Sequence, residues 1–280
     1  MTGRKRQKLR RDVLLYVLLA IGSLSTVFPL LWMVSTSFKS GDVIFEIPPR
    51  LLPDGLHWEN YRKALTEIDF LTLFRNSLVI TVLQLMSNVF VSAFVAFGFA
   101  RFHFPGRNVW FLLVLSTIML PGEVTMIPVF IGFSEIGWIN SIKPLVIPGF
   151  FGGSPVFIFL LRQFFLSIPR ELEESAIIDG AGSFRIFCRI CLPLSVPALM
   201  TIGILSFQGS WNDLLGPLIY LNDADKFTLP LGLSMFKGVM KVEWGPLMAG
   251  SILALVPVLA VFALAQKHFV DGFKLSGIKG

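Results

Sequence analysis

The sequence predicts an all-α membrane protein with six transmembrane helices and a cytoplasmic helix–turn–helix between the fourth and fifth spans. Of its 280 residues, 54% are hydrophobic and 15% are charged, whereas soluble domains carry about 25% charged residues. Six apolar runs approach or exceed the ~20 residues that a helix needs to cross a ~30 Å hydrocarbon core. The longest charged interruption of the second half of the chain, residues 169–193, separates the fourth run from the fifth.

The chain opens with six basic residues between positions 4 and 11, followed by a 22-residue apolar run, residues 13–34. A secretory signal peptide also begins with basic and then apolar residues, but this run is too long and no small-x-small cleavage site follows it. We therefore expect residues 1–12 to be a cytoplasmic N-terminus and residues 13–34 to be a retained first span.

Residues 38–75 are polar and rich in proline, which suits an external loop with a short helix at about 58–67. The second span, about 77–99, carries polar residues at helical steps of four, three, four and four. They are Ser77, Thr81, Gln84, Asn88 and Ser92. Because lipid offers such groups no hydrogen bonds, the stripe faces either a neighbouring helix or water, as a pore wall. The sequence leaves both readings open.

The third predicted span, about 109–130, is interrupted by Pro121-Gly122 and contains Glu123. A charge at mid-membrane costs about 2.5–3.5 kcal/mol, so such residues usually face a cavity or a partner. Near an interface this penalty falls, and Glu123 would then be structural. Both readings stay open.

The fourth predicted span, about 143–161, is punctuated by prolines and glycines and should kink. Gly149 and Gly153 lie four residues apart and could allow close contact with another helix.

The charged stretch predicts two short helices with a glycine turn between them. Ser167 is a candidate N-cap, Pro169 fits a first turn, and Gly180 is a good stop because glycine enters the left-handed conformation cheaply. In the second helix, one apolar stripe is expected from Phe184, Phe187, Cys188 and Cys191. A unit with one apolar and one charged side can lie on a membrane or fit a groove in a partner.

The spacing of this stretch resembles a family motif. Glu174-Ser175-Ala176, three residues, Gly180, nine residues, Ile190, one residue and Leu192-Pro193 match the "EAA" motif of ABC-importer permeases, with serine in place of the first alanine. The flanking residues look like the carbohydrate-importer version of that motif. The ATPase-coupling set implied by the resemblance is Glu173, Glu174, Ser175, Ala176, Asp179, Gly180, Ala181, Ile190, Leu192 and Pro193.

The resemblance implies a function for the whole chain, because it extends from about residue 12 to the end. The chain would be similar to the second permease of maltose-type importers, and residues 166–193 would be its coupling segment. It would form a heterodimer with another permease, above two ATPase subunits and below an extracytoplasmic solute-binding protein. ATP and Mg would be bound by the ATPase, so no cofactor is expected in this chain.

The fifth predicted span, about 194–220, carries Gln208 and Asn212 on one face, which suits either a sugar-sized path or helix contacts. An external loop, 221–246, a sixth span, about 247–265, and a cytoplasmic tail, 267–280, complete the chain. The candidate substrate path comprises Ser77, Thr81, Gln84, Asn88, Glu123, Gln208 and Asn212.

Basic residues predict the orientation of the spans. With six spans, 15 of the 24 lysines and arginines fall on the side of both termini and nine on the other side. Cytoplasmic loops carry the excess of basic residues. Both termini and residues 169–193 are therefore predicted to be cytoplasmic, in a prokaryotic plasma membrane.

Other function classes find little support in the sequence. The net charge of +6 comes from residues scattered at the ends of apolar runs, which does not favour nucleic-acid binding. Cys188 and Cys191 lack the further ligands of a zinc site and are expected to pack on a helix face. No phosphate-binding loop and no catalytic motif occurs, so an enzyme is not expected. The alternatives are an ion-coupled secondary transporter with Glu123 as its ion site, a structural membrane scaffold, or a permease for glycerol phosphate or polyols.

Overall fold

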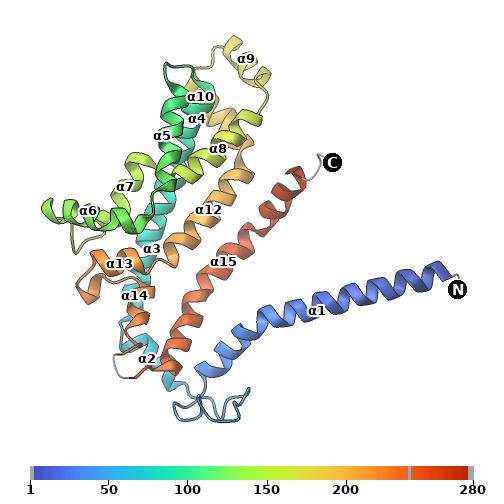
Figure 1. Ribbon diagram of the computed structural model, residues 1–280, viewed down its shortest axis with the longest axis vertical. Coiled ribbons are helices and arrows are strands. Elements are labelled where there is room, and N and C mark those ends of the chain that lie inside the picture. The colour runs from blue at the N-terminus through green and yellow to red at the C-terminus, as the bar shows by residue number, and fades with distance from the viewer. Residues whose placement is uncertain (1–2, 239–240, 277–280) are drawn as a thin grey trace. The chain divides into compact units, whose positions relative to one another are not determined.

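The computed structural model describes residues 3–238 and 241–276, with side chains for residues 11–238 and 241–266 (Figure 1). Within these residues the regular structure is helical, apart from one antiparallel bridge between Lys237 and Val242. The predicted all-α class is therefore confirmed. The side chains of residues 4–10 and of the predicted tail, 267–280, lie outside the described residues.

Most helices follow one another with short links, but α1 and α2 are separated by residues 38–58. In chain order they are α1 (Gly3–Ser37), α2 (Glu59–Thr66), α3 (Phe70–Met86), η1 (Ser87–Val91), α4 (Ser92–Arg101), α5 (Arg107–Ser116), η2 (Thr117–Met119), α6 (Gly122–Glu135), α7 (Lys143–Gly152), α8 (Pro155–Ser167), α9 (Glu171–Ile178), α10 (Ser183–Ile186), η3 (Phe187–Cys191), α11 (Leu192–Leu194), α12 (Val196–Trp211), α13 (Leu215–Tyr220), η4 (Ala224–Lys226), α14 (Leu229–Ser234) and α15 (Trp244–Ser276).

Four continuous helical stretches of the described chain are long and apolar enough to cross a membrane: Arg11–Ser37, Phe70–Arg101, Lys143–Ser167 and Trp244–Gln266. Two bent pairs raise the number to six when each pair counts as one span. They are Arg107–Met119 with Gly122–Glu135, bent by 98°, and Ser183–Leu194 with Val196–Trp211, bent by 78°. Each of the six predicted spans overlaps one of these stretches, and five lie within theirs, whereas the predicted fifth span, 194–220, extends beyond Trp211.

The chain divides into two compact units, of which the first comprises residues 1–70 and 233–255. Its centre is Lys39, whose side chain is buried just after α1. The ammonium lies 4.2 Å from the centroid of the Trp32 ring and donates a hydrogen bond of 2.6 Å to the carbonyl of Arg50. The contact with the aromatic face and the hydrogen bond to the carbonyl together stabilise this buried positive charge. The predicted helix at 58–67 is present as α2.

The second unit comprises residues 71–232 and 256–280 and is built around the packing of α4 on α8 (Figure 1). Ala93, Ala96 and Ala100 are fully or almost fully buried at helical spacing on α4, where small side chains let the partner helix approach closely. The rest of the core cluster comes from α4, α8, α12, the α8–α9 link and the α10–η3 helix. Its members are Phe97, Ile158, Leu161, Phe165, Ile168, Ile186, Phe187, Cys191 and Ile202.

Breaks in the third and fourth spans lie where proline and glycine predicted them. Leu120 is extended (ψ 116°) before Pro121, and α6 starts at the following glycine, as expected for a residue that precedes proline. Between α7 and α8, Gly153 adopts φ +63° and ψ −161°, a conformation open essentially to glycine alone.

Gly149 and Gly153 also confirm the predicted close contact. A Cβ atom on Gly149 would lie 2.5 Å from Ser87 Oγ, and one on Gly153 would lie 3.1 Å from the backbone nitrogen of Ser92. Both glycines therefore let α7 and the following turn lie directly against the middle of the second span.

We expect Gly153→Val to lower the free energy of unfolding by about 1–3 kcal/mol, the usual cost of forcing a side chain into such a conformation. The added contact with the Ser92 backbone acts in the same direction. Thermal unfolding in detergent would measure the change. Gly152→Ala is the matched control, since a Cβ atom there meets nothing within 4 Å. Equal unfolding temperatures for Gly153→Val and the unchanged chain would contradict this account.

Two predicted boundaries are wrong. The second span starts at Phe70 and not near residue 77, so the preceding loop is shorter than 38–75. The fifth span ends at Trp211 and not at Tyr220, since the chain turns before the separate helix α13. Asp213 Oδ1 accepts the backbone N–H of Gly216, in the first turn of α13, at 3.1 Å, and this local side-chain bond competes with continuation of α12.

Candidate functional site

The predicted coupling segment, residues 166–193 and called the coupling segment below, is a helix–turn–helix with a left-handed glycine at its turn. Gly180 has φ +79°, which confirms its predicted role as a helix stop. The N–H of Ala181 donates to the carbonyl of Ala176 at 2.9 Å, and the N–H of Gly180 donates to that of Ile177 at 3.0 Å. This pair of bonds is a Schellman motif, which satisfies the last carbonyls of α9.

The start of α9 differs from the prediction. Ser167 belongs to the last turn of α8, where its hydroxyl bonds to the carbonyl of Phe164, and it does not cap α9. The helix begins at Glu171, two residues after Pro169. Glu171, Glu173 and Glu174 lie in its first turn, where the helix dipole favours acids.

The second helix of the segment is anchored in the core of the second unit. Phe187 and Cys191 are buried together with Ile186, but Phe184 is 70% exposed and Cys188 is exposed. The predicted four-residue stripe is therefore wrong for two of its members. Residues 187–191 form a π-helix, whose wider turn shifts the buried face away from the 3.6-residue period.

The first helix presents most of its surface outward. Among the predicted coupling residues, the exposed ones are Glu174, Ser175, Asp179, Gly180 and Pro193, and the partly buried ones are Glu173, Ala176, Ala181, Ile190 and Leu192. The exposed surface of α9 also includes apolar side chains that sequence reasoning missed, namely Leu172, Ile177 and Ile178, the last 86% exposed. The sequence did contain a signal for exposed apolar residues here, because Ile177 and Ile178 stand directly before Asp179-Gly180 in a charged stretch.

Glu173 is turned toward the protein interior. Its Oε1 lies 2.6 Å from Nε of Arg101, the last residue of α4. The same oxygen accepts a weak hydrogen bond from the Cys191 thiol at 3.7 Å. The resemblance implied that Glu173 contacts the ATPase. In the structure its side chain instead contacts Arg101 and Cys191 of the same chain.

Each residue of the polar stripe on the second span makes a hydrogen bond to another segment of the second unit. Three of them accept a hydrogen bond: Ser77 Oγ from the N–H of Leu229 (2.7 Å), Thr81 Oγ1 from Ser210 Oγ (3.3 Å) and Ser92 Oγ from the N–H of Ser154 (3.0 Å). The two amides donate one: Gln84 Nε2 to the carbonyl of Leu145 (2.7 Å) and Asn88 Nδ2 to Ser206 Oγ (3.0 Å). Of the two readings left open, these contacts favour the interhelical one.

The other candidate path residues are exposed. Glu123 lies in the first turn of α6, where a carboxylate is also favoured by the helix dipole. Gln208 and Asn212 lie one turn apart at the end of α12, and Asn212 Nδ2 donates to the carbonyl of Gln208 at 2.9 Å. Their place on a substrate path stays a prediction.

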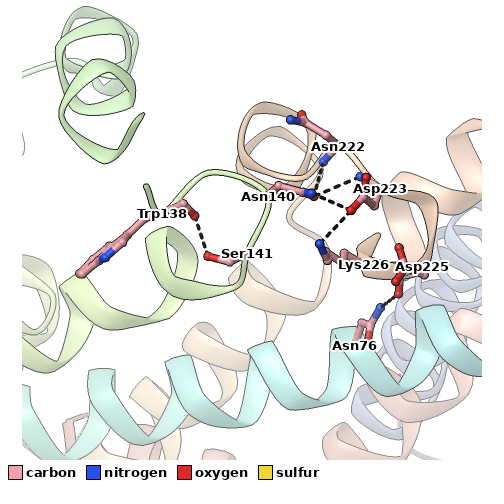
Figure 2. A network of polar contacts seen from close by, with 8 residues as sticks. All are labelled: Asn76, Trp138, Asn140, Ser141, Asn222, Asp223, Asp225 and Lys226. Carbon is pink, nitrogen blue, oxygen red and sulfur yellow. Dashed lines mark hydrogen bonds and ion pairs between the residues drawn. The ribbon is translucent and has the colours of Figure 1, made fainter. Parts of the chain in front are cut away.

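At the end of the second unit that is predicted to face outward, Asn140 joins the α6–α7 link to the chain after α13 (Figure 2). Its Oδ1 accepts the N–H groups of Asn222 and Asp223 at 3.1 Å, and its Nδ2 donates to Asp223 Oδ2 at 2.7 Å. Lys226 Nζ donates to the same carboxylate oxygen at 2.8 Å. These bonds from Lys226 and Asn140 lower the pKa of Asp223, so the carboxylate stays ionised well below neutral pH.

A second tie fixes the start of α3 to the same loop. Asn76 Nδ2 donates to the carbonyls of Asp225 (2.8 Å) and Phe227 (3.0 Å), as Figure 2 shows in part. Sequence reasoning did not single out Asn76 or Asn140, whose partners lie far along the chain.

Comparisons with known proteins agree with this architecture. The family described as "Binding-protein-dependent transport system inner membrane component" matches residues 88–274. A probable ABC transporter permease protein, YurM of Bacillus subtilis, is 37% identical over 95% of this chain and 88% of its own. The trehalose/maltose transport system permease protein MalG of Thermococcus litoralis is 30% identical over 97% of this chain and 100% of its own. In a solved bacterial ABC transporter that imports the acidic polysaccharide alginate, one chain superposes with a TM-score of 0.82 at 24% identity, covering 96% of this chain and 99% of that one.

Proposed function

The chain belongs to the family of inner membrane components of binding-protein-dependent transport systems, the permeases of ABC importers, and we propose that it forms half of the translocation path for an oligosaccharide. The Thermococcus relative is a trehalose/maltose transport system permease, which supports a sugar as the substrate class. Glycerol phosphates and polyols are the competing substrates.

The observation that carries this function is the shape of the coupling segment. Its second helix is locked in the core by Ile186, Phe187 and Cys191, whereas its first helix and turn present Glu174, Ile177 and Ile178 outward. An exposed apolar patch beside acidic groups, held on a rigid base, suits a groove in a partner protein. In our proposal the partner is a separate ATPase, present in two copies, which binds ATP and Mg.

The proposed mechanism turns nucleotide hydrolysis into movement of the spans. Closure of the ATPase pair displaces the coupling segment, and the spans switch from inward-open to outward-open. A solute-binding protein outside then releases sugar into the path formed with a second permease. The excess of basic residues on one side of the predicted spans supports a cytoplasmic location for both termini and the coupling segment. The chain itself carries out no chemical step.

Uptake by whole cells tests this function. Cells with and without the chain are given radiolabelled maltose and trehalose, with glycerol 3-phosphate and sorbitol as competing probes. We expect sugar uptake that requires the chain and the ATPase and resists a protonophore while ATP is maintained. Uptake that stops with the protonophore and continues without the ATPase would instead indicate an ion-coupled carrier.

A further inference from the structure

We propose that Arg101 is a positioning residue that fixes α9 of the coupling segment to α4, so that movement of α9 is passed to the second span. This inference rests on the proposed function, because it concerns how that function is transmitted. It starts from a buried ion pair that joins two segments far apart in the sequence.

The guanidinium of Arg101 holds the link between α8 and α9 at two points. Its Nε lies 2.6 Å from Glu173 Oε1, and its Nη2 donates to the carbonyl of Ile168 at 2.9 Å. The side chain of Arg101 is 5% exposed and that of Glu173 is 14% exposed. One side chain therefore contacts both the start of the link and the first turn of the helix that follows it.

Little else holds α9 in place. None of its residues is fully buried, and Ala176 is its one apolar side chain that packs against the core cluster of the described chain. The second helix of the segment, in contrast, contributes Ile186, Phe187 and Cys191 to the core. Without the ion pair, α9 could pivot about the 168–170 link while α10 stayed fixed.

The Glu173 carboxylate lies at the junction of three elements. It contacts Arg101 of α4 and the Cys191 thiol of η3, and it belongs to α9 itself. Since arginine keeps its proton in proteins, the positive charge persists, and removing only Glu173 would leave it buried and unpaired. Such a removal is strongly destabilising, whereas neutralising both members together is tolerated far better.

A matched set of variants distinguishes a positioning role of Arg101 from a role in folding. Arg101→Gln and Glu173→Gln each leave one polar group unpaired, but the double variant leaves no buried charge. Arg107→Gln is the control, because Arg107, at the start of α5, lies close to Arg101 in the sequence and its Nη1 donates to the carbonyl of Phe102. Arg101→Lys keeps the charge and tests rescue by a conservative change.

The experiment uses the complete transporter, purified with its ATPase and second permease and placed in lipid nanodiscs. ATP hydrolysis is measured with and without the cognate solute-binding protein. We expect the double variant to assemble with its ATPase, while the ratio of stimulated to unstimulated hydrolysis falls about tenfold, within the usual range of coupling between sites. Arg101→Lys should recover part of the stimulation, and Arg107→Gln should behave like the unchanged chain.

Full stimulation in the assembled double variant would overturn the inference, and so would an equal loss in Arg107→Gln. Failure of the inference is distinguishable from failure of the proposed function. If changes at the exposed turn abolish uptake while the double variant stays fully stimulated, the segment still docks but Arg101 does not transmit its movement. If changes at the turn leave uptake normal and the double variant stays fully stimulated, the proposed function itself fails.

Discussion

Valine in place of Gly180 should abolish uptake while the chain still inserts into the membrane. Gly180 has φ +79°, where a residue with a Cβ atom costs roughly 1–2 kcal/mol and a β-branched residue is a genuine outlier. No heavy atom lies within 4 Å of a Cβ atom built there, so the strain is conformational and not a clash. The turn can relieve it only by giving up the Schellman bonds, which would displace Ile177 and Glu174 from the docking geometry.

Uptake of labelled sugar and the amount of chain in membrane fractions measure this prediction. Gly180→Asn is expected to keep part of the activity, because asparagine tolerates the left-handed region. Gly182→Ala is the neutral control, since Gly182 has φ −74° and open space around it. Glu174→Lys should also abolish uptake by reversing an exposed charge of the docking surface. Normal uptake in both Gly180→Val and Glu174→Lys would refute the assigned role of the segment.

The sequence predicted those parts of the fold that depend on local properties. Run length and hydropathy located the six spans, because bilayer thickness sets the length of a crossing helix. Breaks at Pro121 and Gly153 and the stop at Gly180 were predictable, since proline and glycine restrict or free the backbone wherever they occur. The exposed acidic residues of α9 belong to the same class, because a charged stretch flanked by apolar runs is expected outside the membrane, whereas its exposed Leu172, Ile177 and Ile178 were missed.

Features that depend on contacts between distant residues could not be predicted in this way. Nothing in the sequence pairs Arg101 with Glu173 or Asn140 with Asp223. The stripe on the second span was read correctly as a helix face, but only its hydrogen bonds to other helices decide between the two readings left open. Cys188 was misplaced because the pattern assumed 3.6 residues per turn where residues 187–191 form a π-helix.

Replacing Ile178 with aspartate should separate the permease from the ATPase proposed as its partner, without unfolding the permease. Ile178 is 86% exposed at the end of α9, outside every candidate span of the described chain. A charge at a fully exposed position costs the isolated chain almost nothing, since no apolar contact is lost. In a docked complex the same carboxylate would be buried in an apolar groove without a partner, which is strongly unfavourable.

Co-purification of the ATPase with the tagged permease measures this effect. We expect recovery of the ATPase to fall at least about tenfold, as for loss of an interface hot spot, while the thermal unfolding temperature of the permease alone stays unchanged. Leu52→Asp is the matched control, because Leu52 is also highly exposed, at 77%, but lies in the loop predicted to face outward. Undiminished recovery of the ATPase with Ile178→Asp would show that the apolar end of α9 takes no part in docking. A lowered unfolding temperature would instead show that Ile178 stabilises the permease itself.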